Sequence, residues 1–252
     1  MVNNDSTSDI GAVAKVGQVL GLFGPRALEL TANEVAEKTG MNRTTAYRYC
    51  SSMTVAGILE KGSRRGLFTL GPLMLELGAL TLGRQRVVEI ARPWLRQLST
   101  DVRLTAVLSL AGTDAPVVSL VEEDTSRMVV VTVHPGTRLD HTAAQTHLWL
   151  AYSKVLKLDQ IATAQKLTAA ERARLEADVL TAREQRYAFV RQPGGSFTLG
   201  APVFDETGLC ATIGVLGAGD LTETTGVLAE LQKTAHGLSQ ELGAPDDPAT
   251  QV

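Results

Sequence analysis

Apolar residues recur at helical spacing near the beginning of the chain, after a polar stretch at 1–11 that we expect to be disordered. Their spacing of three and four residues predicts an amphipathic helix that ends near Gly24 and Pro25. The positions that define this first helix are Val13, Val16, Val19, Leu20 and Phe23.

Two further helices are indicated by capping signals on either side of Gly40. Thr31 and Glu34 have the spacing of a capping box, which predicts a helix that starts after Thr31. Gly40 suits the left-handed position that commonly ends a helix. Asn42 is a favourable N-cap for the next helix, which we predict over residues 43–50.

The helix that follows Asn42 has one apolar and one polar face. Ala46, Cys50 and Met53 share the inward face, where Cys50 serves as a small core residue. The outward face is basic and rich in hydroxyl groups: Arg43, Thr44, Tyr47, Arg48 and Ser51.

Two short apolar runs at 58–61 and 67–70 flank a segment of Gly, Ser and Arg at 62–66. This arrangement predicts a β-hairpin with a basic tip. Three helices followed by such a hairpin are typical of a winged helix-turn-helix, which places its last helix in the major groove of DNA. The pattern therefore indicates double-stranded DNA as a partner.

The segment 72–82 is apolar on nearly every side, and Glu76 is its one charged residue. A helix of this kind must be buried on more than one side. Its place in the chain favours a linker helix over 72–85 that pairs with its twin in a dimer. A core helix of the following region is the alternative interpretation.

From about residue 87 the chain alternates between helical and extended patterns. The helical patterns cover a segment through Ile90, Leu95 and Leu98, then about 143–156, 167–186 with Thr168 as its N-cap, and 222–242. The extended patterns lie at 105–111, 117–121, 128–133, 196–204 and 209–216. This order predicts an α+β domain with an antiparallel sheet.

Charge is distributed unevenly, although the net charge of −3 would not suggest a nucleic-acid partner. Residues 26–70 contain seven Lys or Arg and four Glu, a net +3, whereas residues 1–25 carry −1 and the remainder carries −5. A basic region at 26–70 in an otherwise acidic chain fits a protein in which only this region contacts phosphate. Chance clustering is the alternative.

The expected DNA contacts lie at helix N-termini and at the hairpin tip. Free N–H groups and the helix dipole make a helix N-terminus favourable for phosphate. Arg43 and Arg48 have the fork geometry for guanine edges or phosphates, and Arg64 and Arg65 would meet phosphate or the minor groove. The full expected set is Thr31, Asn42, Arg43, Thr44, Thr45, Tyr47, Arg48, Arg64 and Arg65.

Enzyme chemistry is not expected from this chain. His141 and His147 lie six residues apart, which is not the spacing of metal ligands on one helix face. Cys210 lies in an apolar run typical of a core, and the glycines at 214–219 do not form a phosphate-binding loop. We therefore expect no catalytic residue, no metal and no cofactor. A sensor module or enzyme that uses its N-terminal helices only for oligomerisation is the alternative.

Composition narrows the setting in which the protein works. Two cysteines are too few for a disulfide framework, and no apolar run approaches the roughly 18 residues of a membrane span. The polar start of the chain is not a secretory signal. Aromatic residues make up 4% of the chain, which argues against single-strand binding by base stacking. We expect a cytoplasmic protein with no membrane partner.

An ordered set of short motifs extends over nearly the whole chain: 30–36, 43–48, 57–59, 68–71, 91–95, 136–138, 141–144, 187–188 and 201–205 with Gly208. Together they resemble the IclR family of bacterial transcription regulators. The resemblance implies a GAF-like effector-binding domain, homodimers or dimers of dimers, and control of catabolic genes by a small metabolite. The implied function is a ligand-responsive regulator that acts as a repressor.

The resulting domain plan has five parts, and its fold class is α+β. A disordered tail at 1–11 precedes a winged helix-turn-helix at 12–71 and a linker helix at 72–85. A GAF-like effector-binding domain at 86–243 is followed by a tail at 244–252.

The resemblance also implies an effector pocket in the second domain. The segment 136–142 precedes a helix, so its backbone N–H groups could receive an effector carboxylate, although His141 more simply holds a loop. Apolar wall is expected around a few polar anchors. The candidate ligand-binding residues are Gly136, His141, Thr142, Ala143, Trp149, Val190, Thr198, Gly214 and Leu216.

Several pocket positions depart from the family pattern. Thr198 stands where the family often has a cysteine, and Gly214 and Leu216 stand in place of two serines. The pair Thr146 and His147 replaces a Gly-Lys pair. We expect these changes to make the cavity less polar, which favours a small organic acid with an aromatic or other apolar body.

Overall fold

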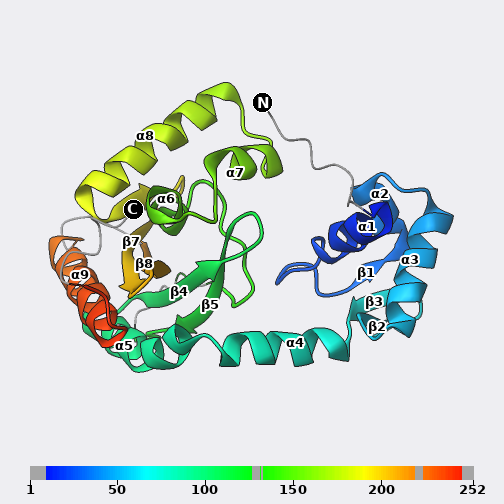
Figure 1. Cartoon of the computed structure of the whole chain (residues 1–252), viewed down its shortest axis with the longest axis horizontal. Coiled ribbons are helices and arrows are strands. Elements are labelled where there is room, and N and C mark those ends of the chain that lie inside the picture. Colours follow the sequence, from blue (N-terminus) through cyan, green and yellow to red (C-terminus); the bar gives the residue numbers. More distant parts are fainter. Residues whose placement is uncertain (1–9, 127–130, 132, 219–223, 246–252) are drawn as a thin grey trace. The chain divides into compact units, whose positions relative to one another are not determined.

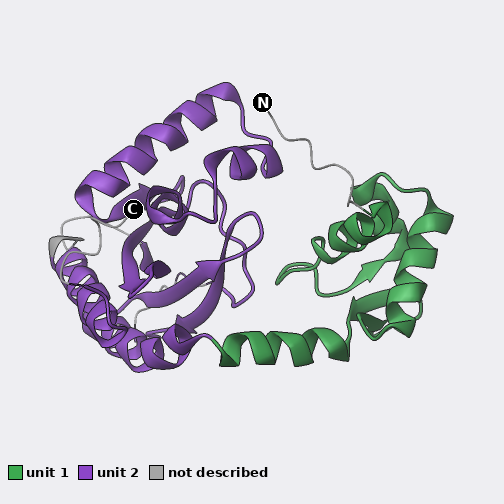
Figure 2. Ribbon diagram, in the orientation of Figure 1, with its two compact units in different colours: residues 1–84 green, residues 85–252 purple. Residues whose placement is uncertain are grey.

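The structure is a computed structural model that describes residues 10–126, 131, 133–218 and 224–245. The chain divides into two compact units, residues 1–84 and 85–252 (Figure 2). Most of the predicted N-terminal tail, most of the strand predicted at 128–133 and most of the C-terminal tail lie outside the described residues. No helix in the described part is long and apolar enough to cross a membrane.

Three helices of unit 1 pack with a small antiparallel sheet (Figure 1). The helices are α1 (Gly11–Leu20), α2 (Ala32–Thr39) and α3 (Arg43–Val55). The strands β1 (Leu30–Thr31), β2 (Leu59–Lys61) and β3 (Leu67–Leu70) have the order β1-β3-β2. The predicted winged helix-turn-helix is confirmed, with β1 as an additional strand that has too few residues to leave a periodic pattern.

The predicted caps form the ends of α2 and α3. Thr31 Oγ1 accepts a hydrogen bond from the Glu34 N–H at 3.2 Å, while the Glu34 carboxylate accepts one from the Thr31 N–H at 2.7 Å. Gly40 ends α2 with a φ of 74°, which is the left-handed region that glycine adopts without strain. Asn42 Oδ1 caps α3 by accepting from the Thr45 N–H at 2.7 Å.

The core of unit 1 matches the predicted inward faces. Ala46, Cys50 and Met53 of α3 are buried. They pack with residues from the other helices and strands of the unit: Val19, Leu30, Val35, Ala36, Leu59 and Phe68. Leu30 and Val35 flank the α2 capping box at the spacing of a hydrophobic staple, and both lie inside this core.

The apolar segment after the hairpin forms α4 (Pro72–Gly83), which belongs to unit 1. Pro72 occupies the first turn, where its missing N–H costs nothing. None of its residues is buried, and Leu75 and Leu80 are 76% and 66% exposed. The alternative interpretation of this segment as a core helix of the second region is therefore wrong.

Unit 2 is built on a five-stranded antiparallel sheet with the order β5-β4-β8-β7-β6. Its strands are β4 (Thr105–Ala111), β5 (Pro116–Glu122), β6 (Ala188–Arg191), β7 (Ser196–Asp205) and β8 (Gly208–Ala218). Its helices are α5 (Arg86–Val102), α6 (Ala144–Tyr152), α7 (Leu158–Ala164), α8 (Ala169–Gln185) and α9 (Thr224–Glu241). The predicted α+β class is confirmed; α7 and β6 were not predicted.

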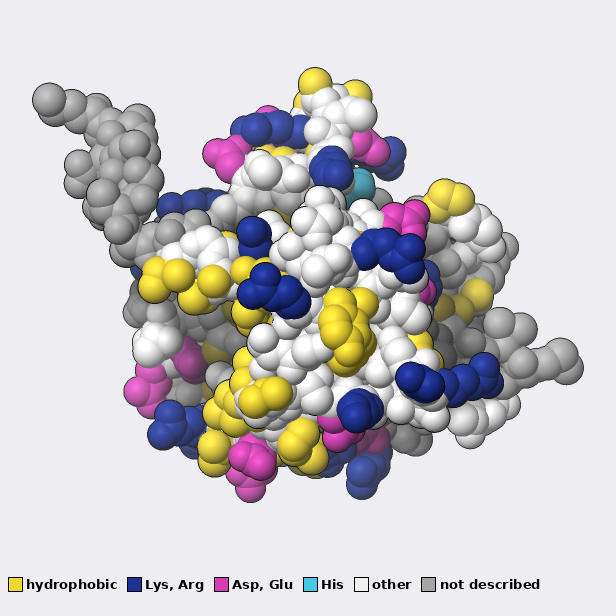
Figure 3. Space-filling view, turned by 90° about the vertical axis from the view of Figure 1, so that its right-hand side faces the viewer, with side chains coloured by type: hydrophobic (Ala, Val, Ile, Leu, Met, Phe, Trp, Pro, Cys, Tyr) yellow, Lys and Arg dark blue, Asp and Glu magenta, His cyan; other side chains and the backbone are white. Residues whose placement is uncertain are grey.

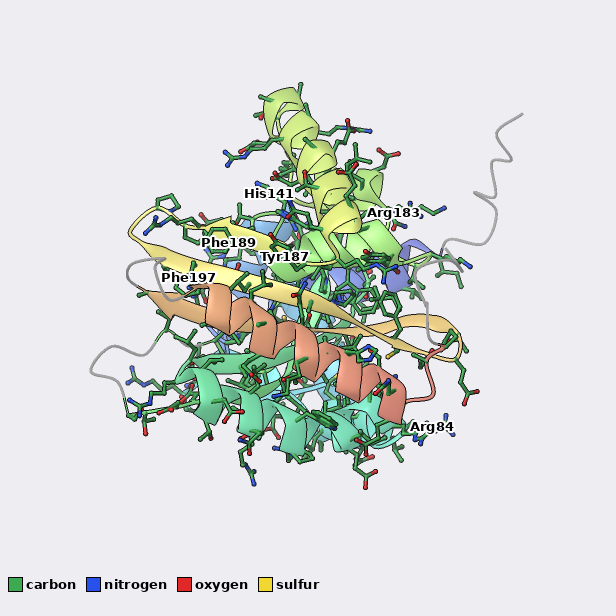
Figure 4. The ribbon with its side chains drawn as sticks, turned by 90° about the vertical axis from the view of Figure 1, so that its left-hand side faces the viewer. Arg84, His141, Arg183, Tyr187, Phe189 and Phe197 are labelled. Atoms are coloured by element: carbon green, nitrogen blue, oxygen red, sulfur yellow. The ribbon has the colours of Figure 1, made fainter. Side chains whose placement is uncertain are left out.

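Helices cover both faces of this sheet (Figure 4). On one face, α5 and α9 pack against alternate strand residues such as Ala106, Leu199 and Val215. On the other face, α6 lies against β7 and β8, and α8 packs on α6. Because strand side chains alternate between faces, the row formed by Thr105, Leu216, Thr198 and Val190 belongs to the α6 face.

Candidate functional site

The N-terminal half of α3 presents a polar, basic surface. Arg43, Thr44 and Arg48 are exposed, Thr45 is half-buried, and Tyr47 is 59% exposed. Lys and Arg side chains (dark blue) stand out at several separate places in Figure 3. The exposed side chains of the α3 N-terminus thus agree with the set expected from the sequence.

The arginines of unit 1 that were expected to contact DNA are not held in ion pairs, although the charge of Arg64 acts on the Glu29 carboxylate. Within the described part of the chain, Arg43, Arg48, Arg64 and Arg65 form no ion pair with a carboxylate. Arg43 Nε instead donates to the neutral Asn33 Oδ1 at 2.7 Å. An unpaired guanidinium on the surface remains available for phosphate or a guanine edge.

The wing is attached to the segment before β1 through Glu29. Its carboxylate accepts hydrogen bonds from the Ser63 N–H at 2.5 Å and the Ser63 hydroxyl at 2.7 Å. These two bonds, with a smaller contribution from the charge of Arg64, lower the pKa of Glu29 below its usual 4.5. Gly62 packs so closely against Glu29 that a Cβ would lie 2.8 Å from Oε1. The turn that carries Arg64 and Arg65 is therefore anchored at Gly62 and Ser63.

Two residues expected at the DNA surface also have a structural role. The Thr31 hydroxyl donates to Glu34 at 2.8 Å as part of the α2 cap. The Asn42 side-chain oxygen is occupied by the Thr45 N–H. Their contribution to DNA binding stays a prediction, and in the free protein both side chains hold helix ends.

The loop expected to receive a carboxylate uses its backbone donors internally. The Gly136 N–H donates to Val118 O at 2.8 Å and the Leu139 N–H donates to Pro116 O at 2.8 Å. The His141 N–H donates to Gln165 Oε1 at 2.8 Å, and the Thr142 N–H donates to Asp140 Oδ1 at 2.9 Å. The reasoning that these N–H groups are free for an effector is therefore wrong for the described state.

A backbone N–H at the start of α6 is likewise already bonded, in this case to a side chain of the sheet. Thr198 Oγ1 accepts from the Ala144 N–H at 3.4 Å, so the residue in the family's cysteine position holds the helix end. Gly214 leaves room for the Gln145 amide, because a Cβ at 214 would overlap Nε2 of that side chain. Gln145 is buried. The Gln145 amide thus occupies the space beside Gly214, and the expected lower polarity of the cavity stays a prediction.

Unit 2 contains a cavity of about 540 Å³ formed by the start of α6, by α8 and by the turn between β6 and β7. Its size falls within the range of small-molecule sites. Of the predicted ligand residues it brings together His141, Thr142 and Val190. The others, Gly136, Ala143, Trp149, Thr198, Gly214 and Leu216, do not line it, and their role in binding stays a prediction. The remaining lining residues are His147, Glu171, Arg174, Leu175, Asp178, Arg191, Gln192 and Pro193.

His147 is the most deeply buried polar residue of this lining, with 4% of its surface exposed. Its Nε2 lies 2.8 Å from the His141 carbonyl oxygen. Burial lowers the pKa of His147 below its usual 6.5, an effect that the charge of Asp178 opposes. The sequence analysis named His147 among the pocket positions that depart from the family pattern, but did not count it as a ligand residue. Its contact with His141 forms only when the loop folds back beside α8 (Figure 4).

A smaller hollow of about 380 Å³ lies on the other side of His141. Its lining includes Asp114 and Arg138, which form an ion pair, and Gln165. The Gln165 side-chain oxygen accepts from the backbone N–H of His141 and lies 3.0 Å from His141 Nδ1. His141 thus holds a loop between two hollows, as expected.

Metal or nucleophile chemistry finds no support among the residues that the structure describes. They contain no group of three His, Cys, Asp or Glu side chains placed to hold a metal ion. Burial raises the pKa of Cys210 to about 12, and burial also raises the pKa of Cys50. Neither thiol would ionise readily at neutral pH.

Comparison with protein families agrees with both units. Residues 12–63 match the IclR helix-turn-helix domain, and residues 79–240 match the bacterial transcriptional regulator IclR C-terminal domain. The chain belongs to the IclR family. It is therefore a DNA-binding transcriptional regulator, as the motifs and the winged unit indicated.

Individual IclR relatives cover most of the chain. The HTH-type transcriptional regulator BhcR of Paracoccus denitrificans is 28% identical over 215 residues, which is 81% of this chain and 76% of BhcR. An IclR regulator structure from Silicibacter sp. TM1040 has a TM-score of 0.80 at 22% identity and covers 95% of this chain and 99% of its own. An IclR homologue from Microbacterium hydrocarbonoxydans, complexed with 4-hydroxybenzoate, has a TM-score of 0.69 at 19% identity and covers 92% and 98%.

Proposed function

We propose that this IclR-family protein is a homodimeric repressor of catabolic genes that responds to a small organic acid with an aromatic or other apolar body. The observation that carries the proposal is the pairing of an exposed basic face on α3 with a separate cavity of about 540 Å³ in the GAF-like unit 2. One unit offers a surface for DNA, and the other offers a site for a metabolite. DNA binding would place its work in the cytoplasm.

The α3 helix would enter the major groove, with Arg43 and Arg48 at guanine edges or phosphates and the wing at phosphate or the minor groove. The absence of carboxylate partners for these arginines within the described residues supports this placement. Binding of this kind releases counterions, so operator affinity should fall steeply as salt rises.

Dimerisation through α4 would cover the exposed leucines of that helix. An apolar surface such as Leu75 and Leu80 is costly in water and favours pairing with an equivalent surface. A symmetric dimer would then present two α3 helices to half-sites about 34 Å apart along the duplex. Two such dimers could further associate into a tetramer.

An aromatic acid is the proposed effector class. The cavity is lined by apolar residues, by histidines, by two carboxylates and by two arginines. The apolar residues suit an apolar body, and the arginines offer positive charge for an acidic group. The complex of an IclR homologue with 4-hydroxybenzoate supports the same class. The effector can alter operator affinity only if it binds two protein states differently, and α4 is our candidate for the element that changes.

The test is fluorescence anisotropy of the full-length protein with duplex DNA from just upstream of its own gene, with and without a panel of aromatic and aliphatic acids. Saturable binding that resists competitor DNA and is weakened by an aromatic acid supports the proposal. Binding of an acid without any saturable duplex binding would favour the alternative, a sensor or enzyme that does not bind DNA.

The direction of regulation requires a separate measurement. A reporter placed behind the same upstream DNA should be silenced by the protein and restored when the acid is added. Higher expression in the presence of the protein would show activation and contradict the repressor role.

A further inference from the structure

The cavity of unit 2 contains one deeply buried imidazole that the DNA-binding function does not explain. His147 lies on α6, is 4% exposed, and lines the cavity together with residues of α8 and the β6–β7 turn. A buried polar side chain normally has its hydrogen-bonding groups satisfied. Which of its two ring nitrogens is satisfied therefore determines what the other can do.

The tautomer of His147 follows from its contact with the loop. A carbonyl oxygen can only accept, so Nε2, which lies 2.8 Å from the His141 carbonyl, must donate a proton to it. Burial favours the neutral ring over the charged one. A neutral imidazole that is protonated on Nε2 has an unprotonated Nδ1, which can only accept a hydrogen bond.

The second ring nitrogen is open to the cavity. Nδ1 has no hydrogen-bond partner among the described residues, and it is not one of their fully enclosed unpartnered polar atoms, which are Thr105 Oγ1, Thr146 Oγ1 and Trp149 Nε1. Nδ1 therefore keeps some accessible surface, and the cavity is the hollow that His147 lines. A hydrogen-bond donor placed there would find an unused acceptor.

We propose that His147 Nδ1 accepts a hydrogen bond from a hydroxyl group of the effector, so that the sensor selects hydroxylated organic acids over acids that lack the hydroxyl. This inference rests on the proposed function, because it assumes that unit 2 binds an organic acid. It adds the chemical group that the effector must carry and the residue that reads it.

The rest of the lining can accommodate such a molecule. Leu175, Val190 and Pro193 provide apolar surface for an aromatic or aliphatic body. Arg174 and Arg191 bring positive charge for a carboxylate, beside the carboxylates of Glu171 and Asp178 that also line the cavity. Arg174 lies 3.9 Å from Asp178, a loose contact between exposed groups. A hydroxyl on the opposite end of the acid from its carboxylate would let one molecule reach both His147 and a cation.

The expected selectivity follows from the cost of leaving a buried acceptor without a donor. A site that hydrogen-bonds a substrate hydroxyl discriminates strongly against the analogue that lacks it. We expect 4-hydroxybenzoate to bind the full-length protein at least about tenfold more tightly than benzoate. We expect 4-methoxybenzoate, which has the oxygen but no donor, to bind no better than benzoate.

Two variants separate recognition from loop support. In His147→Gln the side-chain amide reaches the position of Nε2 and can still donate to the His141 carbonyl, but nothing replaces the Nδ1 acceptor. In His147→Asn the amide instead lies near the position of Nδ1. We expect His147→Gln to lose the preference for the hydroxylated acid while keeping its affinity for benzoate, and His147→Asn to keep part of the preference.

The measurement is isothermal titration calorimetry of the wild-type protein and both variants with the three benzoates, with operator binding by the same preparations as the check on folding. Equal affinities of the wild type for 4-hydroxybenzoate and 4-methoxybenzoate would overturn the inference without using any variant. An unchanged preference in His147→Gln would also overturn it. A lack of binding by any of the three benzoates would overturn the inference alone. Operator binding that no acid of the wider panel alters would instead contradict the proposed function.

Discussion

Asn33 of α2 holds Arg43 of α3 through a hydrogen bond of 2.7 Å between Asn33 Oδ1 and Arg43 Nε. Both side chains are exposed at the N-terminal ends of the two helices. A neutral amide orients the guanidinium without cancelling its charge, as a carboxylate would. The two terminal nitrogens of Arg43 remain available as a fork for a guanine edge or a phosphate.

We expect Asn33→Ala to weaken specific operator binding by about fivefold, roughly the 1 kcal/mol of one hydrogen bond. Without the amide, Arg43 must be ordered when DNA binds. The preference for guanine at its base pair should relax, while non-specific affinity stays unchanged. Anisotropy titrations with the operator and with single-base operator variants measure both effects.

A double-mutant cycle with Arg43→Ala provides the control, since Asn33 should have no further effect once Arg43 is gone. Asn33→Asp keeps an acceptor and should retain the base preference with lower overall affinity, because it adds a negative charge near phosphate. Equal losses from Asn33→Ala in both backgrounds would show that Asn33 acts independently of Arg43.

Replacement of Arg43 and Arg48 together by Ala should abolish specific operator binding and leave the fold intact, since both side chains are exposed and neither contributes to the core. The slope of log affinity against log salt should decrease by about 1 for each arginine that contacts phosphate. Arg84→Ala, which removes an exposed arginine outside α3, is the matched control. Operator affinity that survives the double substitution would refute the placement of α3 in the groove.

The Glu29–Ser63 contact should make the wing sensitive to acid. The pKa of Glu29 is lower in the folded protein than in the unfolded chain, so its contribution to stability is present above the usual value of 4.5 and is lost as pH falls through the folded value. The protection of the Ser63 amide, which is its hydrogen-exchange rate relative to the intrinsic rate at the same pH, should therefore decrease at acid pH.

Glu29→Ala should show little protection of Ser63 at every pH. Glu29→Gln, which keeps a hydrogen-bonding oxygen, should show more protection than Glu29→Ala, and this protection should not decrease in acid. Glu37, which is exposed and has no such partner among the described residues, offers Glu37→Ala as a control for the loss of one carboxylate. Protection of Ser63 that is the same in Glu29→Ala and the wild type would contradict the role of this contact.

Local signals allowed most of the fold to be predicted, because caps, glycines and hydrophobic periodicity act over a few residues. The Thr31 capping box and the N-caps at Asn42 and Thr168 all occur where the sequence placed them. The strands β1 and β6 were missed, because a strand of two or four residues carries almost no periodic pattern. Both become visible only through their pairing with β3 and β7.

The candidate pocket was harder to predict, because its properties depend on contacts between distant segments. The bond from the Leu139 N–H to Pro116 O removes a donor that the loop sequence seemed to offer. The Gln145 amide fills the space at Gly214, 69 positions further along the chain. His147 joins His141 only through the fold of the loop. Alignment with a family pattern cannot reveal that a residue from a distant segment occupies a hydrogen-bond donor or fills a space.

Restoring the family's serine at position 214 should destabilise unit 2 by about 1–3 kcal/mol, the usual cost of an overpacked core. Its Cβ would overlap the Gln145 amide and lie 2.9 Å from the Leu199 carbonyl oxygen, which is backbone and cannot move aside. Thermal unfolding of Gly214→Ser measures the loss.

Shortening Gln145 to Ala in the same protein should recover only part of the stability, because the contact with Leu199 remains. Gly226→Ala in α9 is the control: nothing lies within 4 Å of its added Cβ, and alanine is favoured over glycine inside a helix. A Gly214→Ser protein that is as stable as the wild type would mean that the sheet and α6 can separate here.

The last prediction concerns α4, whose leucines face solvent in the single chain. Lysine at Leu75 and Leu80 should leave each subunit folded, because these side chains are 76% and 66% exposed and support no core. In a dimer paired through α4 the same lysines would place like charges in a desolvated contact, and we expect the dimer to dissociate at least tenfold more readily. Sedimentation velocity over a concentration series measures the dissociation, and anisotropy should show a parallel loss of operator affinity, since a monomer engages only one half-site.

Val155→Lys, at a residue of unit 2 that is 68% exposed, controls for the added charge. A dimer that survives both lysines would assign the pairing surface to another part of the protein and leave the exposed leucines of α4 to a different partner.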